Sequence, residues 1–422
     1  MISLRSGIFK KCSICHTTDS KRGERVSLRG KTTTDELRDI LQDAHISFLI
    51  GAGTSSGVFD VLGDLETALT ELAATKTADP TQARTVRAAL YAKFFDGVVV
   101  KNNLILDRDP STQQLFADHR QFVRTINELL VRRRSSILNK QVNLFTTNID
   151  LLLELTLDDL GIDLNDGFTG RFKLHFDTSN FGALRYRRSL QYENLSEVPT
   201  FNLLKLHGSA AWDSSDDSKN IYFDPTLKQV AKVAEVLNAA RVELEPLAVT
   251  DPIDLNGLLA ASQEITNTGH IDAFVNEYEK LAIINPTKEK FQTTVLNDNY
   301  YDLLRVLSNE LEKENSVLMA MGFSFRDEHI KHLIVRAARS NPTLRVIVFC
   351  YDDAALAKVE SEIDEALVRN SNIVLVGPTS SDDEAKLTLS RITEQYLAPV
   401  LGKKSRVDED AEDEGSSADE PE

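Results

Sequence analysis

Three short stretches of this sequence carry residues suited to ligand binding or proton transfer, and each comes directly after an apolar run. They are Gly51, Ala52, Gly53 and Ser55 after the run 46–50, then Thr147, Asn148 and Asp150 after 142–145, and His207 after 201–206. In an open α/β sheet, ligands bind at the carboxyl ends of the strands. Histidine ordinarily titrates near neutral pH and can accept or release a proton there. Together the stretches predict a ligand site with His207 as its acid–base group.

The first stretch has the pattern G-x-G-x-x-x-G, from Gly51 to Gly57. Glycine lets the backbone turn sharply and approach a ligand, and free N–H groups at the start of the following helix can hold a diphosphate. The spacing is one residue longer than in the usual dinucleotide fingerprint, so a simple tight turn is the alternative. Asn148 likewise has an alternative role as a helix cap, and His207 has one as a structural histidine.

The alternation of short apolar runs with amphipathic segments predicts an α/β fold, Rossmann-like, with a mainly parallel sheet and helical insertions. The first helix is expected to begin at Thr33, since Thr33 and Glu36 have the spacing of a capping box. Strands are expected at 46–50, 142–145, 201–206, 317–321, 344–348 and 373–376, and helices at 151–160, 226–244, 271–281, 327–339 and 385–401. Residues 58–140 and 213–300 are expected to be helical insertions in one domain that spans 33–401.

With 41% hydrophobic and 27% charged residues, the 422-residue chain has the composition of a soluble globular protein. It has no apolar run of about 18 residues that could span a membrane, and residues 1–30 lack the apolar stretch of a secretory signal. We therefore expect a cytoplasmic protein. Of the net charge of −17, nine acidic residues fall in 408–422, which leaves −8 for the remainder. This balance argues against direct nucleic-acid binding, which needs clustered Lys and Arg.

The two ends of the chain differ from its middle. Residues 1–32 are basic and rich in Ser, Thr and Gly, which predicts a flexible arm, whereas residues 402–422 are too acidic to fold alone and predict a disordered tail. The chain has three cysteines, too few for a disulfide framework: Cys12, Cys15 and Cys350. Neither the C-x-x-C-H pattern at 12–16 nor the pair His329 and His332 has the further ligands of a metal site, so no metal is expected.

The residues at the strand exits resemble the motifs of the sirtuin family, in the same order and with similar spacing. Five segments carry the likeness: GAGTSSG at 51–57, TTNID at 146–150, KLHGS at 205–209, GFS at 322–324 and FCYD at 349–352. The resemblance spans about residues 33–378. It implies a Rossmann-like domain that takes NAD as its substrate.

The resemblance also implies roles for individual residues. Asn148 would orient ribose hydroxyls and the attacking water, Asp150 would shape the nicotinamide pocket, and His207 would act as general base. The remaining residues would bind the rest of NAD: Gly51, Ala52, Gly53 and Ser55 at the pyrophosphate, and Gly322, Ser324, Tyr351 and Asp352 at the adenosine half. Thr147 would be a further residue of the NAD site. A helix cap is the alternative role for Ser324. Cleavage of the nicotinamide bond leaves oxocarbenium character on the ribose, which calls for nearby negative charge and a positioned water.

Two departures separate this chain from deacylase sirtuins. It has no cysteine in 210–349, where those enzymes carry a four-cysteine zinc module, and residues 57–60, Gly-Val-Phe-Asp, lack the arginine that follows their glycine loop. The segments 165–170 and 322–329 resemble a bacterial branch of sirtuin-like antiphage proteins that hydrolyse NAD, of which one group works with a HerA-type hexameric ATPase. The resemblance thus implies an NAD+ hydrolase that depletes NAD in defence, as a homo-oligomer with such an ATPase. A protein deacylase and a non-catalytic NAD or ADP-ribose sensor are the alternatives.

Overall fold

The structure is a computed structural model that describes residues 29–30, 32–61, 63–75, 79–133, 137–190, 194–214, 220–284, 294–363, 370–378 and 385–402. Most of the predicted basic arm, including Cys12 and Cys15, lies outside the described residues, as does the acidic tail from residue 403.

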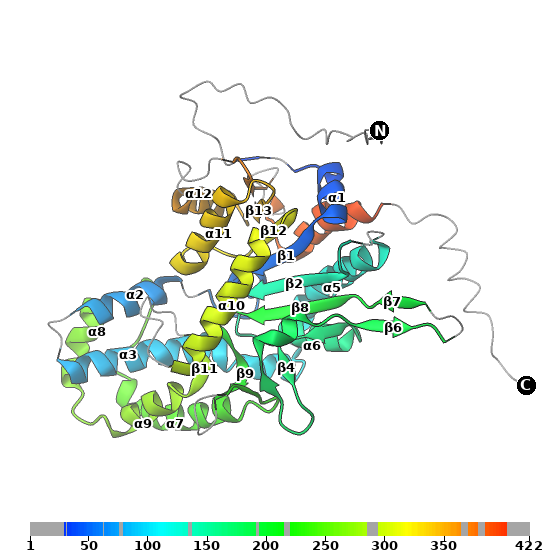
Figure 1. The fold of residues 1–422 in the computed structure, drawn as a ribbon. Helices are drawn as coiled ribbons and strands as arrows, with labels where there is room; N and C mark the ends of the chain where they lie inside the picture. Colours follow the sequence, from blue (N-terminus) through cyan, green and yellow to red (C-terminus); the bar gives the residue numbers. More distant parts are fainter. Residues whose placement is uncertain are drawn as a thin grey trace, which may run out of the picture.

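A parallel sheet forms the centre of the molecule (Figure 1). Among the described residues it has seven strands in the order β14-β13-β12-β1-β2-β8-β3, and every adjacent pair runs parallel. The strands are β1 His45–Ile50, β2 Gln141–Thr146, β3 Asp163–Asn165, β8 Thr200–Lys205, β12 Ser316–Met321, β13 Arg345–Phe349 and β14 Ile373–Val376. The predicted α/β fold with a mainly parallel sheet is confirmed and is compatible with a Rossmann-like fold. The six strands expected from the sequence are present to within one residue at each end.

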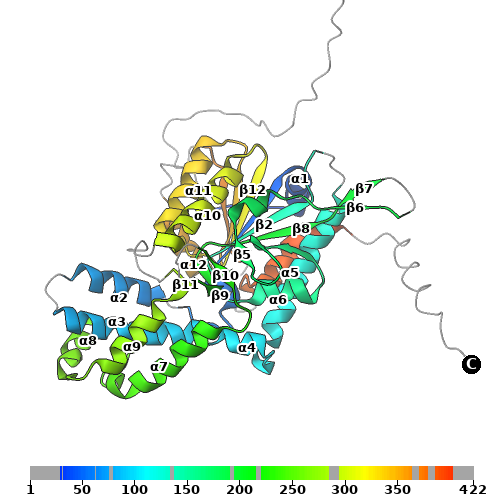
Figure 2. The same cartoon turned by 60° about the horizontal axis from the view of Figure 1, so that its bottom comes forward.

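Helices cover both faces of this sheet, as Figure 2 shows. One face packs on α1 Thr34–Asp43, α5 Gln113–Arg132, α6 Leu152–Asp159 and α13 Leu389–Ile392, and the other on α10 Thr294–Glu312, α11 Glu328–Ser340 and α12 Asp353–Glu362. Adjacent residues of β1 therefore point to opposite faces. Phe48 packs in the core with α1 and α5, and Leu49 packs in the core with α10 and α11. Burial on both faces explains why the strands are continuous apolar runs rather than alternating ones.

Most helices of the two predicted insertions pack together as one layer with its own hydrophobic core, whereas α5, which also falls in 58–140, packs on the central sheet (Figure 1). From 58–140 come α2 Gly63–Ala74, α3 Pro80–Phe94, the π-helix η2 Phe95–Val99 and α4 Asn102–Leu106; from 213–300 come α7 Lys228–Leu244, α8 Leu255–Ala261 and α9 Gly269–Tyr278. The rings of Tyr91 on α3 and Tyr278 on α9 stack with centroids 4.2 Å apart. Segments far apart in the sequence thus make a single structural unit.

The segment between residues 163 and 283 contains strands that the sequence did not predict. An antiparallel sheet has the order β11-β9-β10-β5-β4, and a separate two-stranded ribbon pairs β6 with β7. Their bounds are β4 Phe168–Thr169, β5 His175–Phe176, β6 Tyr186–Arg188, β7 Leu195–Glu197, β9 Gly208–Asp213, β10 Tyr222–Phe223 and β11 Leu281–Ile283. The insertion at 213–300 is therefore not purely helical.

Two predicted helices end or begin differently in the structure. The helix expected at 271–281 stops at Tyr278, because Leu281 pairs with Asp213 in β9 and starts β11. The helix expected at 385–401 begins only at Leu389, after Thr388, whose hydroxyl accepts from the N–H of Arg391. It continues as a π-helix and a 3₁₀ turn, η8 Thr393–Leu397 and η9 Ala398–Leu401. Further short turns are η1 Ala52–Ser55, η3 Pro110–Thr112, η4 Thr178–Gly182 and η5 Ser262–Glu264.

The chain joins the body of the protein earlier than expected. The predicted capping box is confirmed, since Thr33 Oγ1 accepts from the N–H of Glu36 at 3.2 Å and the Glu36 carboxylate accepts from the N–H of Thr33 at 3.0 Å. Before it, Arg29 forms a parallel bridge with Leu375 of β14, and its guanidinium pairs with Glu360 at 2.6 Å. Arg29 and Gly30 therefore belong to the sheet edge and not to a free arm.

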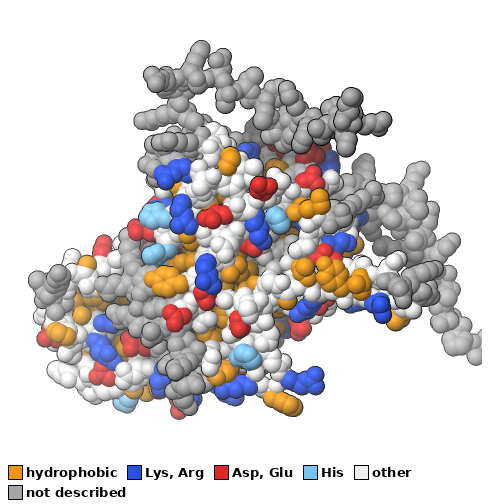
Figure 3. All heavy atoms as spheres, in the orientation of Figure 1, with side chains coloured by type: hydrophobic (Ala, Val, Ile, Leu, Met, Phe, Trp, Pro, Cys, Tyr) orange, Lys and Arg blue, Asp and Glu red, His pale blue; other side chains and the backbone are white. Residues whose placement is uncertain are grey.

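The surface gives two further facts. Among the described helices, none combines the length and the apolar character needed to cross a membrane. On the face drawn in Figure 3, basic and acidic side chains are interspersed.

Candidate active site

The connections of the central sheet change direction between β1 and β12. From β1 the chain proceeds to β2 on one side, and from β12 it proceeds to β13 on the other. The loops at the carboxyl ends of two such strands diverge, which opens a crevice where ligands bind in α/β sheets. The loops after β1, β2, β8 and β12 all meet at this edge.

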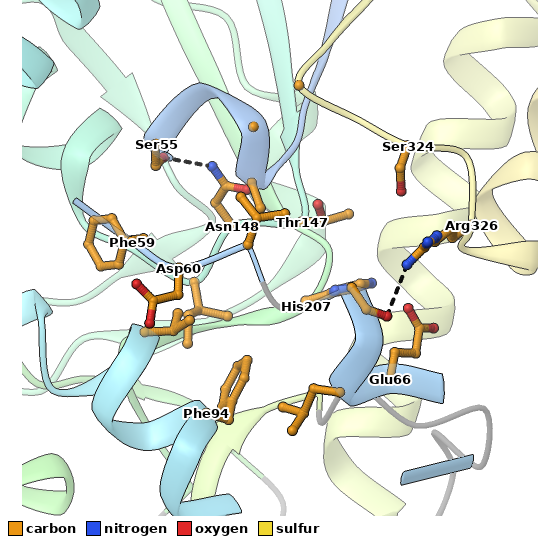
Figure 4. Close-up of a pocket in the computed structure, with 18 of the residues that line it drawn as sticks. Ser55, Phe59, Asp60, Glu66, Phe94, Thr147, Asn148, His207, Ser324 and Arg326 are labelled. Carbon is orange, nitrogen blue, oxygen red and sulfur yellow. Dashed lines mark hydrogen bonds between the residues drawn. The ribbon is translucent and has the colours of Figure 1, made fainter. Parts of the chain in front are cut away.

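A cavity of about 500 Å³ occupies this crevice (Figure 4). Residues from four strand exits line it: Ala52, Gly53 and Ser55 after β1; Thr147, Asn148, Ile149 and Asp150 after β2; His207 after β8; and Gly322, Phe323, Ser324, Arg326 and Asp327 after β12. The helical layer closes the cavity with Phe59, Phe94 and Val98. The volume lies in the range of small-molecule sites. Most of the predicted site residues are thus brought to one cavity.

The glycine loop packs tightly against the loop that follows β12. Three of its N–H groups donate within the protein: Gly51 to the Met321 carbonyl, Gly53 to the Gly322 carbonyl and Thr54 to the Gly51 carbonyl, at 3.0–3.1 Å. A Cβ at Gly51 would lie 2.4 Å from the carbonyl oxygen of Gly322, whereas the φ of Gly51, −112°, suits any residue. Contact between two loops therefore explains Gly51, which does not line the cavity. Three of the N–H groups expected near a diphosphate are used inside the protein.

The hydroxyl groups of the same loop are also used inside the protein. Thr54 Oγ1 donates to the Gly51 carbonyl at 2.9 Å, and Ser56 Oγ donates to the Gly53 carbonyl at 3.1 Å. Ser55 Oγ donates to Asp150 Oδ2 at 3.0 Å. Because an ionised carboxylate can only accept hydrogen bonds, the proton of Ser55 must face Asp150. Ser55 therefore lines the cavity without offering its proton to a ligand.

These hydroxyl groups orient the side-chain amide of Asn148. Its Nδ2 donates to Ser55 Oγ at 3.1 Å and to Thr54 Oγ1 at 3.4 Å (Figure 4). Since both hydroxyl protons are engaged elsewhere, the two oxygens can only accept, which decides which end of the amide faces them. Asn148 Oδ1 is then buried with no hydrogen-bond partner among the described residues. Such an acceptor suits a donor brought by a ligand or a water.

Asp150 holds the loop after β2 in place. Its Oδ1 accepts from the N–H of Leu152 at 3.2 Å, and its backbone carbonyl accepts from the ammonium of Lys205. Lys205 also pairs with Glu154 at 2.8 Å, and these two side chains are only 4% and 12% exposed. Burial raises the pKa of Glu154, and the nearby ammonium opposes that rise. Both charges are sequestered beneath the site, so losing either partner would leave the other buried and unpaired.

His207 lies at the turn between β8 and β9, where Gly208, with φ +78°, lets the chain reverse. Its Nε2 is 3.0 Å from Asp327 Oδ2, while Asp327 Oδ1 accepts the N–H groups of His329 and Ile330 as the cap of α11. A carboxylate that accepts from Nε2 favours the tautomer with the proton on Nε2. In that tautomer Nδ1 carries the lone pair, and a proton would be taken up there. Next to this pair, burial and the charge of Asp327 raise the pKa of Tyr300, which therefore stays neutral.

The loop after β12 holds a residue in a costly conformation. Phe325 has φ +58° and is fully buried, with its ring 5.1 Å from that of Phe323. A bulky residue in the left-handed region costs about 1–3 kcal/mol and persists only where packing imposes it. This conformation keeps Phe325 in the core while Ser324 and Arg326 on either side reach the cavity (Figure 4).

Besides Gly51, two predicted site residues, Tyr351 and Asp352, do not line the cavity. Asp352 caps α12 by accepting from the N–H of Ala355 at 2.7 Å, and Tyr351 is 43% exposed. The alternative role of Ser324 as a helix cap is wrong, because Asp327 caps α11.

Other residues of the site were missed from the sequence. The sequence indicates Arg326 only as part of 322–329 and Asp327 only there and as the start of the helix 327–339. No local signal pairs Asp327 with a histidine 120 positions away. The apolar wall from the helical layer was likewise not expected. Its position depends on how the insertion folds back over the sheet.

The fold and the site together define an α/β protein with a switch-point cavity that combines an aspartate-paired histidine with an oriented asparagine. The described residues contain no group of three or more His, Cys, Asp or Glu side chains placed to hold a metal ion. Comparison with known proteins finds no family and no curated protein that matches the chain.

Proposed function

We propose that this chain is a sirtuin-like NAD+ hydrolase that converts NAD+ to nicotinamide and ADP-ribose. One observation carries the proposal: the Asp327-paired His207 and the oriented amide of Asn148 line a single cavity at the carboxyl edge of a parallel sheet. The motif likeness at 51–57, 146–150 and 205–209 supports it independently.

The cavity residues suit the hydrolysis of an N-glycosidic bond. The bond between ribose C1′ and nicotinamide N1 breaks, and its electron pair stays on N1, which neutralises the pyridinium ring. The ribose acquires oxocarbenium character that a nearby carboxylate stabilises, and Asp150 lines the cavity. The oxygen of a water then bonds to C1′ and the water gives up a proton.

Asn148 and His207 would handle that water. Asn148 Oδ1, a buried acceptor with no partner in the described part of the chain, would receive a hydrogen bond from a ribose hydroxyl or from the water itself. His207 takes up the proton released by the water, directly or through a ribose hydroxyl, and the Asp327 carboxylate stabilises the resulting imidazolium.

Chromatography of NAD+ incubated with the purified chain, alone and with a HerA-type ATPase, tests this proposal. We expect nicotinamide and ADP-ribose in equal amounts. Rapid turnover of an acetyl-lysine peptide would instead favour a protein deacylase. Binding of ADP-ribose without any turnover of NAD+ would favour a sensor.

We also propose that NAD+ depletion serves antiphage defence and that the chain acts as a homo-oligomer docked on a HerA-type hexameric ATPase. The likeness at 165–170 and 322–329 supports this part. An enzyme that destroys NAD+ has to be gated, and subunit contacts that position loops are a common means. Light scattering on the 47.1 kDa chain tests it. A monomer mass that the ATPase leaves unchanged would contradict the assembly.

A further inference from the structure

We propose that Arg326, with Ser324 beside it, binds the diphosphate of the nucleotide. The identity of the nucleotide rests on the proposed function. The assignment of the anion-binding loop rests on the hydrogen bonds of the two loops that meet at the switch point.

Several donors of the glycine loop are already used inside the protein. The N–H groups of Gly51, Gly53 and Thr54 all donate to carbonyl groups of the protein. The hydroxyl protons of Ser55 and Ser56 are directed to Asp150 and to the Gly53 carbonyl. Binding a dianion there would require these bonds to break, and each lost bond to a buried group costs about 1–3 kcal/mol.

The loop after β12, by contrast, carries a side chain with several donors directed to the cavity. Arg326 lines the cavity, and its guanidinium donates through Nη1 to the carbonyl of Gly63 at 2.9 Å (Figure 4). Within the described part of the chain, no carboxylate forms an ion pair with this guanidinium. Arginine has five N–H donors in a planar fork that matches phosphate oxygens in pairs. One donor is therefore used to hold the side chain, and the rest of the fork can serve a ligand.

The bond to Gly63 sets the position of the guanidinium in advance. A Cβ at residue 63 would lie 2.4 Å from Arg326 Nη1, so only glycine lets the start of α2 come so close. On the other side, the left-handed conformation of Phe325 directs Ser324 and Arg326 into the same cavity. A side chain held in place before binding loses less conformational entropy when the ligand arrives.

The distribution of charge in the cavity agrees with this assignment. Lys358 of α12 lines the cavity together with Arg326, which puts two cations on the side of the later strands. On the side of the glycine loop, the lining residue Asp60 is paired with Lys101 at 2.7 Å, and Lys93 is paired with Asp251 at 2.7 Å. Asp150 adds a carboxylate beneath that loop. Although the lining also includes Asp64, Glu66 and Asp327, Arg326 and Lys358 are where the negative charge of a diphosphate can be matched.

Calorimetric titration with ADP and with adenosine tests the inference without requiring catalysis. Arg326→Gln should weaken ADP binding by at least about tenfold, the usual scale for a lost charged hydrogen bond, and leave adenosine binding unchanged. Arg336→Gln, which removes an arginine of α11 that bonds Ser308, is the matched control and should bind ADP like the wild type. If Arg326→Gln fails to fold, Arg326→Lys keeps the charge without the fork and should still weaken ADP binding. ADP binding that is unaffected by either substitution overturns the inference.

Gly63→Ala provides a second variant that leaves the charge in place. The added methyl group should displace the guanidinium and weaken ADP binding several-fold, with little change for adenosine. In an NAD+ assay, Arg326→Gln should raise KM and leave kcat nearly unchanged, because the diphosphate is remote from the bond that breaks. Arg326-dependent ADP binding without NAD+ hydrolysis would contradict the proposed function alone. NAD+ hydrolysis in which Arg326→Gln has the same KM as the wild type would contradict this inference alone.

Discussion

The glycine loop at 51–57 and the loop at 322–327 meet at the switch point but use their polar groups in opposite ways. The first directs three of its N–H groups and its three hydroxyl groups into the protein, onto carbonyl groups and onto Asp150. The second places Ser324 and Arg326 in the cavity by holding Phe325 in a left-handed conformation. A glycine-rich pattern thus does not by itself show which donors face a ligand, whereas the hydrogen bonds that each donor makes do.

The two loops also hold the side chains of the cavity in position in different ways. The glycine loop is a rigid base that orients Asn148 through Ser55 and Thr54. The later loop carries conformational strain and contributes Asp327, which orients His207 and caps α11 at the same time. Strain of this kind collects where function demands a particular side-chain position. Of the two proposed catalytic side chains, Asn148 is oriented by the glycine loop and His207 by the later loop.

The largest effect is expected from the two side chains that the loops orient. Asn148→Ala and His207→Ala should each lower kcat for NAD+ hydrolysis by at least about 100-fold, the scale for losing a positioned acid–base group. His270→Ala, at a surface histidine that pairs with Glu243, is the control and should be fully active. Full activity of His207→Ala would show that another group is the base.

The contribution of the later loop to catalysis can be isolated with Asp327→Asn. Asparagine caps a helix about as well as aspartate, so the melting temperature should stay close to that of the wild type. The weaker partner of His207 should nevertheless lower kcat by at least about tenfold. Asp254→Asn makes the same change at the cap of α8, outside the cavity, and should leave kcat unchanged. Equal activity of both variants would remove Asp327 from the mechanism.

A smaller effect, on stability, tests the contact between the loops. Gly51→Ala should lower the free energy of unfolding by about 1–3 kcal/mol, since the new Cβ would meet the Gly322 carbonyl. Gly57→Ala is the matched control within the same pattern. No atom lies within 4 Å of a Cβ at Gly57, so its effect should stay within about 0.5 kcal/mol. Denaturant unfolding measures both variants, and equal stability would show that the two loops are not interlocked.

The smallest effect is expected far from both loops. Deletion of Asp408–Glu422 removes nine acidic residues and almost no apolar surface, so it should leave the melting temperature and the rate of NAD+ hydrolysis nearly unchanged. A fall in melting temperature of more than a few degrees would show that the tail contacts the folded body.

Six strands of the central sheet and the polar residues at their exits could be predicted from the sequence alone. Buried parallel strands are continuous apolar runs, and the residues that follow them lie at one edge of the sheet wherever the strands fall in the order. Asn148, Asp150 and His207 could therefore be assigned to one site without coordinates, and so could the cap at Thr33. Each of these features depends on residues that are close in the chain.

Only the tertiary structure decided how these parts are connected. Asp327 reaches His207 across 120 positions, and the insertions join through Tyr91 and Tyr278, which no local pattern encodes. The pattern at 51–57 is equally compatible with close approach to a ligand and with close approach to another loop, and the Gly322 carbonyl 2.4 Å from a Cβ at Gly51 decides for the loop. Likewise, only the pairing of Leu281 with β9 shows that this residue belongs to a strand and not to the preceding helix. A local pattern states what a segment can form, whereas long-range contacts select which of its possible partners it meets.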